Sequence, residues 1–312
     1  MKKYAFGVDI GGTTVKIGLF KTNGELMDTW EIKTRTEDGG ANILPDIAEA
    51  INAKLAEKGI AIGEVEGIGM GVPGPVDDEG CVLGCVNLGW GVFNAAKEMK
   101  ALTGLTTEVG NDANVAALGE MWMGGGKGHS SIVMVTLGTG VGGGVILNGK
   151  IVPGTNGAAG EIGHMTMVDD ETEVCGCGKC GCLEQYTSAN GVARVAKKYV
   201  EEHAEIATKL REVENITSKE VFDFAREGDE VALHIVDETG KMLGKALAYI
   251  SCVMDPESFV IGGGMSKAGD ILIDAIKKHF VKYAFHASRD TEFKVATLGN
   301  LAGIYGSVKM VL

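Results

Sequence analysis

The fold is decided by residues 4–20, YAFGVDIGGTTVKIGLF, in which two apolar runs flank a Gly-Gly-Thr-Thr turn. Apolar runs bounded by such a turn predict a β-hairpin with strands at 4–10 and 15–20. The pattern returns at residues 131–147, SIVMVTLGTGVGGGVIL, with a Gly-Thr-Gly turn in the equivalent place. The two copies begin roughly 127 residues apart, so we interpret the chain as an internal repeat that forms two α/β halves.

Each hairpin is followed by patterns typical of helices and further strands. Ile43, Ile47, Ile51 and Leu55 recur at every fourth residue, which predicts an amphipathic helix that ends near Gly59. No linker rich in proline or serine separates the halves, so we expect them to share a cleft. The other predicted elements are helices at 115–123, 188–203, 229–254 and about 270–280, strands at 65–70, 106–109 and 259–261, and hairpin turns at 22–25 and 148–149.

Composition and charge exclude several classes of protein. The formal net charge is −13 and no run of Lys or Arg occurs, so the phosphate backbone of a nucleic acid would be repelled. The apolar run at the start of the chain is interrupted by Asp9 and the glycines after it, before a signal peptide or a membrane span could form. We therefore expect a cytoplasmic protein with neither nucleic acid nor a membrane as its partner.

The two Gly/Thr turns are candidate phosphate sites. Gly11-Gly12-Thr13 and Gly138-Thr139 can each aim backbone N–H groups and a hydroxyl at one anion, and Asp9 can hold Mg²⁺ through water. Either turn alone could be a plain hairpin turn, but two equivalent turns in a repeat favour a pair that grips a polyphosphate. Residues 138–143 resemble the glycine-rich motif that binds dinucleotides, but a strand follows Gly143 where that motif requires a helix, so we do not interpret them as a dinucleotide site. Lys16 is either a phosphate contact or a solvated strand lysine.

Asp112 is the candidate general base. It lies in Asn111-Asp112-Ala113-Asn114, between a short apolar stretch and a helical run. An aspartate at such a junction can simply cap the helix. Between two phosphate-binding halves, however, it also stands where a hydroxyl that attacks a γ-phosphate must lose its proton.

A cysteine-rich segment, CGCGKCGC at residues 175–182, predicts a metal site. Together with His164, the thiols Cys175, Cys177 and Cys182 supply four ligands of the softness that zinc prefers, which leaves no open position and so indicates a structural metal. A redox pair of Cys177 and Cys180 is the alternative, but the strand-to-helix context of such pairs is missing.

Two carboxylates flank this segment. Glu161 lies three residues before His164, and Glu184 lies two residues after the last cysteine. Carboxylates accept hydrogen bonds from hydroxyl groups, so this pair suits a polyol ligand.

With these motifs, the chain resembles the ROK family of sugar kinases and repressors, and within it the bacterial ATP-dependent glucokinases. The resemblance spans essentially the whole length. The motifs that carry it are DIGGT (9–13), GVPGPVD (71–77), NLGW (87–90), NDAN (111–114), LGTGVGGG (137–144), EIGH (161–164), the cysteine segment with Glu184, and GGG (262–264).

The resemblance implies an α/β fold of the two-lobed, actin-like ATPase type, a duplicated ribonuclease H-like fold with the active site in the interlobe cleft. We expect a smaller N-terminal lobe at 1–112 and a larger C-terminal lobe at 113–301 that carries the zinc loop 164–184. A final helix at about 302–312 is expected to pack back on the first lobe.

The family's site residues carry over to matching positions. The resemblance implies that Asp112 is the catalytic base for a sugar 6-hydroxyl, that ATP binds with Mg²⁺, and that a structural Zn²⁺ is present. Cys180 departs from the commoner pattern, in which this position is not a thiol. The implied sugar ligands are Asn87, Asn111, Asp112, Glu161, His164 and Glu184; the phosphate and nucleotide turns are Asp9, Gly11, Gly12, Thr13, Gly138, Thr139, Gly263 and Gly264; the zinc ligands are His164, Cys175, Cys177 and Cys182.

The predicted function is ATP-dependent phosphorylation of glucose to glucose 6-phosphate. The resemblance also implies that the protein is a homodimer. Trp90, after Asn87, favours glucose. The alternatives within the class are kinases for fructose, mannose, N-acetylglucosamine or N-acetylmannosamine. A sugar-sensing ROK regulator is less consistent, because only eight residues precede Asp9 and we expect no DNA-binding module there. An actin-like or chaperone-like ATPase would not need Glu161, His164 and Glu184.

Overall fold

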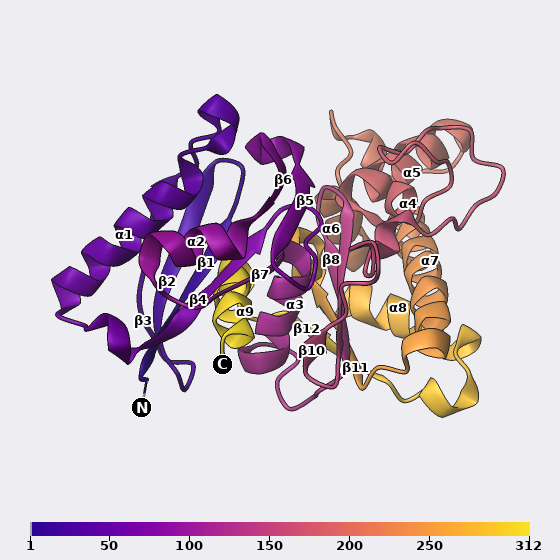
Figure 1. Cartoon of the computed structure of the whole chain (residues 1–312). Coiled ribbons are helices and arrows are strands. Elements are labelled where there is room, and N and C mark those ends of the chain that lie inside the picture. The colour runs from indigo at the N-terminus through magenta and orange to yellow at the C-terminus, as the bar shows by residue number, and fades with distance from the viewer. Residues whose placement is uncertain (1) are drawn as a thin grey trace. The chain divides into compact units, whose positions relative to one another are not determined.

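The hairpin predicted at residues 4–20 is present in the computed structural model, which describes residues 2–312 (Figure 1). Strand β1 (Tyr4–Ile10) pairs antiparallel with β2 (Thr14–Lys21), and the Gly-Gly-Thr turn lies between them. The first sheet has the order β3-β2-β1-β4-β7, with β3 at Leu26–Lys33, β4 at Val65–Val72 and β7 at Thr107–Asn111. Because β1, β4 and β7 run parallel, their carboxyl ends meet at one edge of this sheet.

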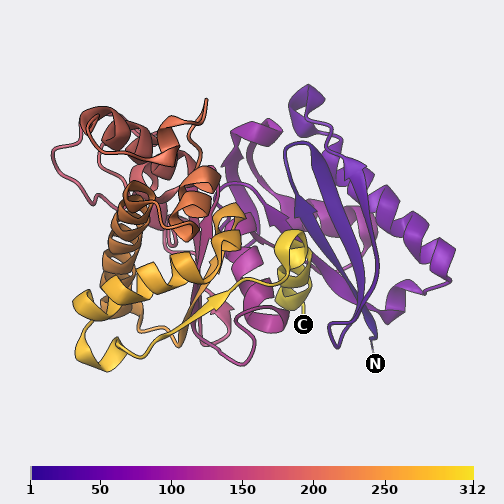
Figure 2. The same ribbon diagram turned by 180° about the vertical axis from the view of Figure 1, so that it is seen from behind.

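Helices cover both faces of this first sheet. Figures 1 and 2 show α1 (Ile43–Lys58) and α2 (Ala95–Thr103) on one face and α9 (Ala302–Met310) on the other. The alternation of β1 explains the two layers. Its residues Phe6, Val8 and Ile10 are buried in the cluster that α1 joins, whereas Ala5 is buried in a cluster with residues of α9.

Helix α9 approaches the sheet so closely that two positions must be glycine. A Cβ at Gly69 would lie 1.7 Å from the carbonyl oxygen of Ser307, and one at Gly7 would lie 2.1 Å from that of Ile304. The Ser307 hydroxyl also donates a hydrogen bond of 2.8 Å to the carbonyl oxygen of Val8. The last helix is therefore an integral layer of this sheet.

The second hairpin belongs to a second five-stranded sheet, with the order β10-β9-β8-β11-β12. Strands β8, β11 and β12 run parallel. Helix α7 lies so close to α8 at Gly240 and Gly244 that a Cβ added at either position would lie 2.6 Å from a backbone atom of α8. These elements are β8 (Ile132–Leu137), β9 (Val141–Leu147), β10 (Lys150–Ile151), β11 (Ser258–Gly262), β12 (Glu292–Val295), α4 (Glu184–Thr187), α5 (Ala189–Glu202), α6 (Ser218–Arg226), α7 (Glu230–Met254) and α8 (Asp270–Tyr283).

The remaining elements are short. Helix α3 (Asp112–Met123) follows β7, and β5 (Cys81–Cys85) pairs with β6 (Trp90–Asn94). The 3₁₀ helices lie at Glu37–Gly40, Ile62–Glu64, Val86–Leu88, Ile162–His164, Lys209–Arg211, Gly264–Ala268, His286–Ser288 and Gly299–Leu301. None of the helices in residues 2–312 combines the length and apolar character needed to cross a membrane.

The chain divides into two compact units, which we describe separately. Unit 1 contains Met1–Ser130, Gly144–Gly160 and Thr297–Leu312, and unit 2 contains Ser131–Gly143 and Glu161–Ala296. Helix α3 lies in unit 1, and so does α9. The predicted lobe boundary at Asp112 stays a prediction.

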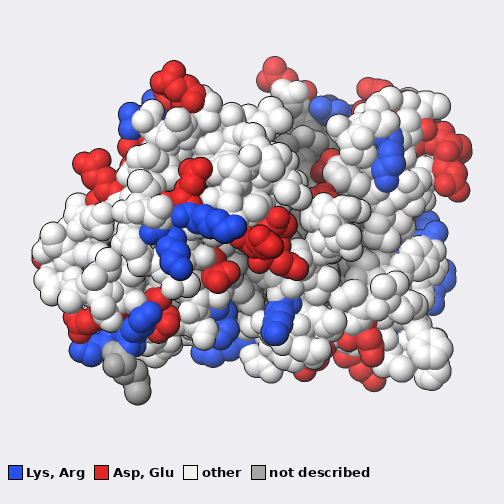
Figure 3. Space-filling model, in the orientation of Figure 1, with Lys and Arg blue, Asp and Glu red and all other residues white. Residues whose placement is uncertain are grey.

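The α/β class and the predicted elements are confirmed by the two mixed sheets and their helices, within a few residues at the ends. The elements that were not predicted from the sequence are α2, α4, α6, β5, β6 and β12. Charged side chains of both signs are interspersed on the face shown in Figure 3. Lys54 of α1 and Asp28 of β3 form one ion pair, with 3.0 Å between the ammonium nitrogen and a carboxylate oxygen.

The close approach of α9 gives a stability prediction. Gly69→Ala should lower the free energy of unfolding by about 1–3 kcal/mol, because the new methyl group meets the backbone of α9 and not a movable side chain. Urea unfolding measures the loss. Gly63→Ala is the matched control, since a Cβ there has no neighbour within 4 Å. Equal midpoints for Gly69→Ala and the wild type would contradict the packing of α9 described above.

Candidate active site

The first Gly/Thr turn presents its backbone to solvent. The Gly11 N–H donates to the carbonyl oxygen of Thr14 over 3.0 Å, and the Thr34 hydroxyl donates to the Gly11 carbonyl oxygen over 2.7 Å. Gly12 and Thr13 are exposed, and a Cβ at Gly12 would have no neighbour within 4 Å. These two hydrogen bonds fix the turn, while its tip at Gly12 and Thr13 stays accessible to an anion.

Asp9 lies next to this turn at the end of β1, beside Gly71 of β4. Burial raises the pKa of the Asp9 carboxyl, and the negative charge of Asp112 raises it further, although Lys16 opposes both effects. A Cβ at Gly303 of α9 would lie 2.5 Å from an Asp9 carboxylate oxygen, so that position needs glycine. Two carboxylates that disfavour each other's charge form a fitting environment for a divalent cation.

Lys16 is half-buried, and its ammonium group is engaged by other groups of the protein in this conformation. Its ammonium group lies 3.3 Å from a carboxylate oxygen of Glu31 and donates to the carbonyl oxygen of Asn300 over 3.1 Å. The lysine therefore connects β2 and β3 to the segment before α9.

Asp112 is the first residue of α3, and Asn111 is the N-cap. The side-chain oxygen of Asn111 accepts hydrogen bonds from the N–H groups of Ala113 and Asn114, so the simple capping role that Asp112 could have had belongs to its neighbour. Oδ1 of Asp112 accepts from Nδ2 of Asn111 over 3.0 Å and from the Ala113 N–H over 2.8 Å. Nδ2 of Asn111 also donates to the carbonyl oxygen of Gly74 over 3.1 Å. This hydrogen bond connects the loop at residues 73–77 to the start of α3.

Asn87 lies on an exposed 3₁₀ turn between β5 and β6. The turn is anchored by its neighbours, because Leu88 and Trp90 are buried and the Trp90 indole N–H donates to the carbonyl oxygen of Gly40 over 3.1 Å. Trp90 therefore fixes the position of Asn87 through packing.

In unit 2, the second Gly/Thr turn opens onto a cavity of about 530 Å³. The Ala189 N–H at the start of α5 donates to the carbonyl oxygen of Gly138 over 2.8 Å, which fixes the turn. Gly263 has a φ of +81°, and a Cβ there would lie 2.4 Å from the carbonyl oxygen of Leu137, so the turn after β11 packs directly on the end of β8. Thr139 and Gly264 line the cavity from these two turns.

The far wall of this cavity was missed by the sequence analysis. It consists of α6 and the 3₁₀ helix after Gly263, which contribute Phe222, Arg226, Met265 and Lys267. An apolar ring, a flexible thioether and two cations suit an aromatic base that carries phosphates. The local signals of α6 are the capping box formed by Thr217 and Glu220 and an amphipathic pattern in which Val221, Phe222 and Ala225 are buried.

His164, Cys175, Cys177 and Cys182 come together as predicted. Their ligand atoms all lie within 4.8 Å of one another. Nδ1 of His164 is 3.8 Å from Sγ of Cys175, and Sγ of Cys177 is 3.6 Å from Sγ of Cys182. One imidazole and three thiols at these separations fit a tetrahedral zinc ion, and Cys180 is not a member of the group.

Backbone hydrogen bonds join the residues just after His164 to the end of the cysteine segment. The Leu183 N–H donates to the carbonyl oxygen of Met165 over 2.8 Å, and the Met167 N–H donates to that of Gly181 over 2.7 Å. The other ring nitrogen of His164, Nε2, faces the exposed Glu161, whose Oε2 lies 3.8 Å away. One imidazole can thus serve the thiols on one side and a ligand on the other.

Glu184 lies against the second Gly/Thr turn. Its Oε2 accepts a hydrogen bond of 2.8 Å from the Val141 N–H, and a Cβ at Gly140 would lie 2.2 Å from the same oxygen. A hollow of about 350 Å³ is lined by Glu184, Gly138 and Gly263, among others. A candidate sugar ligand and a candidate phosphate turn are therefore neighbours within one unit.

The candidate residues fall into two groups. Unit 1 carries Asp9, Gly11, Gly12, Thr13, Asn87, Asn111 and Asp112, and unit 2 carries Gly138, Thr139, Glu161, His164, Glu184, Gly263, Gly264 and the cysteines. Within unit 1, Asp9, Asn111 and Asp112 meet at the carboxyl edge of the sheet. Within unit 2, His164 and the three cysteines lie in the part of the chain that leads to Glu184, and Glu184 contacts the turn between β8 and β9.

The chain is similar to known proteins over nearly its whole length. The chain is 46% identical over 308 residues to a glucokinase of Halalkalibacterium halodurans, covering 97% of this chain and 93% of that protein. It is 36% identical over 310 residues to a glucokinase of Thermotoga maritima, with 98% and 96% covered. A crystal structure of a ROK family glucokinase from Streptomyces griseus, in complex with glucose and AMPPNP, matches with a TM-score of 0.70 and 34% identity over 98% of each chain.

These likenesses confirm the predicted fold, since the Streptomyces griseus structure aligns with nearly every residue. The sequence pattern of the ROK family matches residues 5–312. The chain belongs to the ROK family.

Proposed function

We propose that the protein is an ATP-dependent kinase that phosphorylates glucose on its 6-hydroxyl group. The observation that carries the proposal is the contact between Glu184 and the Gly138–Val141 turn, which joins a hydroxyl-binding carboxylate to a phosphate-binding turn. The relatives named glucokinase, at 36–46% identity over nearly the whole chain, support glucose as the substrate.

In this proposal the cavity of unit 2 binds ATP. The adenine ring of ATP lies against Phe222 and Met265, while the turns at Gly138 and Gly263 direct their backbone N–H groups to the phosphates. Mg²⁺ bound near Asp9 would neutralise charge on the transferred phosphoryl group. Gly11, Gly12 and Thr13 supply further phosphate contacts.

Asp112 accepts the proton of the 6-hydroxyl. One of its oxygens is held by Asn111 and the Ala113 N–H, so the carboxylate keeps one orientation. It stands in the first turn of α3, where the helix dipole stabilises its negative charge. An oriented, ionised carboxylate is what a general base in phosphoryl transfer requires.

The sugar hydroxyls bind to side chains with fixed orientation. Glu161 and Glu184 accept from hydroxyl groups, and the Asn87 and Asn111 amides both donate and accept. Nε2–H of His164 donates to a sugar oxygen, because Nδ1 faces the thiols. Zinc, when bound by His164 and the three cysteines, holds this ring and the segment that leads to Glu184.

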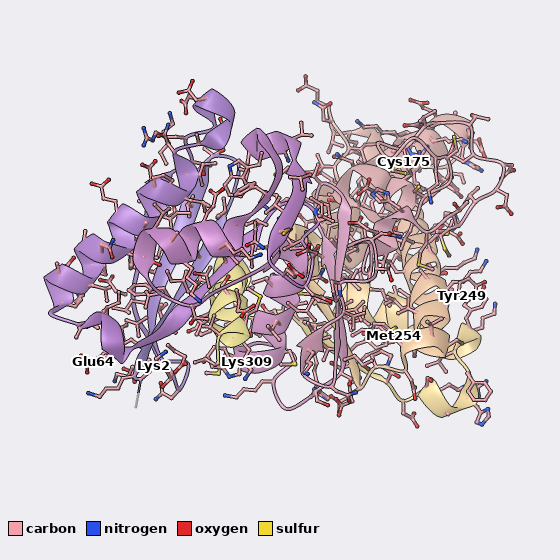
Figure 4. The ribbon with its side chains drawn as sticks, viewed as in Figure 1. Lys2, Glu64, Cys175, Tyr249, Met254 and Lys309 are labelled. Carbon is pink, nitrogen blue, oxygen red and sulfur yellow. The ribbon has the colours of Figure 1, made fainter. Side chains whose placement is uncertain are left out.

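We also propose a cytoplasmic homodimer. Three large apolar residues are exposed, Tyr249 and Val253 of α7 and Phe285 after α8, with relative accessibilities of 46%, 81% and 57%, and Figure 4 shows Tyr249 on the outer side of α7. Exposed apolar side chains of this size favour a protein partner.

The sugar preference is tested with a panel of substrates. We expect kcat/KM with ATP to be highest for glucose, ahead of mannose, fructose, N-acetylglucosamine and N-acetylmannosamine, because the relatives at 36–46% identity are named glucokinase. A higher kcat/KM for any other sugar would replace glucose as the substrate. No phosphorylation of any sugar would overturn the proposed function.

Replacing the proposed base separates chemistry from binding. Asp112→Asn should lower kcat by about 10²–10⁴-fold, the usual contribution of a general base. Glucose affinity, measured by calorimetry, should change little, since the amide keeps the size of the carboxyl and one acceptor. Asp78→Asn, at an exposed aspartate of the same unit, is the control with unchanged kcat. An Asp112→Asn enzyme that keeps most of its kcat would exclude this role.

Metal removal tests the structural site. Cys177→Ser, or treatment with a chelator, should raise the KM for glucose and lower the unfolding temperature before it changes the KM for ATP, because the nucleotide cavity contains none of the four ligands. Cys252→Ser, at an exposed cysteine of α7, should change neither KM. Elemental analysis that finds no zinc in protein purified without chelators would remove the premise.

A further inference from the structure

Arg194 of α5 contacts both the loop before the cysteine segment and helix α4 after it. Its Nη1 lies 3.0 Å from Oε2 of Glu171 and 2.7 Å from Oε2 of Glu173, in the loop between His164 and Cys175. Its Nε donates to the carbonyl oxygen of Gln185 in α4 over 3.2 Å, and the guanidinium lies over the Tyr186 ring at 5.0 Å. One side chain thus connects three segments of unit 2.

Glu171 is shared between Arg194 and Tyr186. The Tyr186 hydroxyl donates to Oε2 of Glu171 over 2.6 Å. This hydrogen bond, the Glu173 N–H and the guanidinium together lower the pKa of the Glu171 carboxyl to about 2, and burial with Glu171 beside it raises the pKa of the Tyr186 hydroxyl to about 12. We name the group of Arg194, Glu171 and Tyr186 the Arg194 clamp; at neutral pH it pairs a cationic guanidinium with an anionic carboxylate and a neutral phenol.

The clamp reaches the candidate sugar ligand through two neighbouring residues. Oε1 of Gln185 accepts from the Cys182 N–H over 3.0 Å, and its Nε2 donates to the carbonyl oxygen of Glu173 over 2.8 Å. Gln185 and Tyr186 follow Glu184 directly in α4, which has only four residues. So short a helix has no stability of its own, and its orientation depends on such side-chain contacts.

We propose that Arg194 is a positioning residue for the sugar site, which holds Glu184 and the cysteine segment in their binding conformation through Glu171 and Tyr186. The proposal rests on the proposed function, because it assigns Glu184 to the sugar. It concerns no atom of the substrate, since Arg194 acts only through the residues that it contacts.

A cavity of about 520 Å³ beside the clamp makes a direct test possible. Arg194, Glu171 and Tyr186 line it, together with Tyr199, His234 and other residues of α5 and α7. The Arg194 side chain is 27% exposed, so a small solute can reach the space that the guanidinium fills. Shortening Arg194 to alanine leaves a site shaped and charged for guanidinium itself.

The experiment is chemical rescue of Arg194→Ala. We expect the KM for glucose to rise about tenfold, as for the loss of hydrogen bonds to a charged group, while kcat and the KM for ATP stay within about twofold. Guanidinium at a non-denaturing concentration should restore much of the glucose KM, and sodium or ammonium chloride of equal ionic strength should not. Arg194→Lys, which keeps the charge but not the fork of donors, should fall between.

A second readout does not depend on catalysis. Loss of zinc to a chelator should be faster in Arg194→Ala than in the wild type. Arg211→Ala is the matched control, because Arg211 also donates to backbone carbonyl oxygens in unit 2 but touches neither the cysteine segment nor α4. This control should show the wild-type KM and the wild-type rate of zinc loss.

The outcomes separate the two proposals. A glucose KM and a zinc-loss rate within twofold of the wild type in folded Arg194→Ala would overturn the clamp. A drop in apparent kcat at an unchanged KM would also overturn it, because this result indicates loss of folded protein only. If Arg194→Ala does not fold, Tyr186→Phe tests the same prediction with a smaller change. If the wild type phosphorylates no sugar, the proposed function fails, and zinc loss still tests the clamp.

Discussion

The candidate site of unit 2 depends on one contact, the carboxylate of Glu184 against the backbone of the turn between β8 and β9. The Val141 N–H binds one carboxylate oxygen, and Gly140 leaves the space that the carboxylate fills. Any side chain at position 140 would displace Glu184, the four-residue helix that carries it, or the turn. The glycine-rich turn accommodates an acidic side chain, and in the proposed function it also binds an anionic ligand. His164 with the three cysteines, and the Arg194 clamp, lie in the parts of the chain next to this contact.

The elements that could be predicted were those with a strong local signal. The hairpins follow from apolar runs around glycine, and the zinc ligands follow from rare residue types close together in the sequence. Asp112 and Asn111 show the limit of this reasoning. Both can cap a helix, and only the geometry shows that Asn111 takes the cap and leaves the Asp112 carboxylate to be oriented by it.

The missed residues are those whose role depends on distant partners. Phe222 and Arg226 follow the pattern of any amphipathic helix, and nothing within α6 indicates that the turn at Gly138 lies opposite. Arg194 likewise resembles a surface arginine until the loop at Glu171 is placed beside it. Lys16, for which a phosphate and the solvent were the two predicted surroundings, instead pairs with Glu31 and a backbone oxygen contributed by Asn300. Such pairings over long distances in the chain leave no local pattern.

The order in which the chain is synthesised has a consequence for unit 1. Gly303 packs on Asp9, and Ser307 and Ile304 pack on β1 and β4, yet almost the whole chain separates them from the first hairpin. During translation, the first sheet emerges with one apolar face uncovered and waits for its last layer until α9 leaves the ribosome. Unit 2, whose segments all precede Thr297, is released earlier. The half that is made first is thus completed last, and until then its uncovered apolar face is the kind of surface through which incomplete chains aggregate.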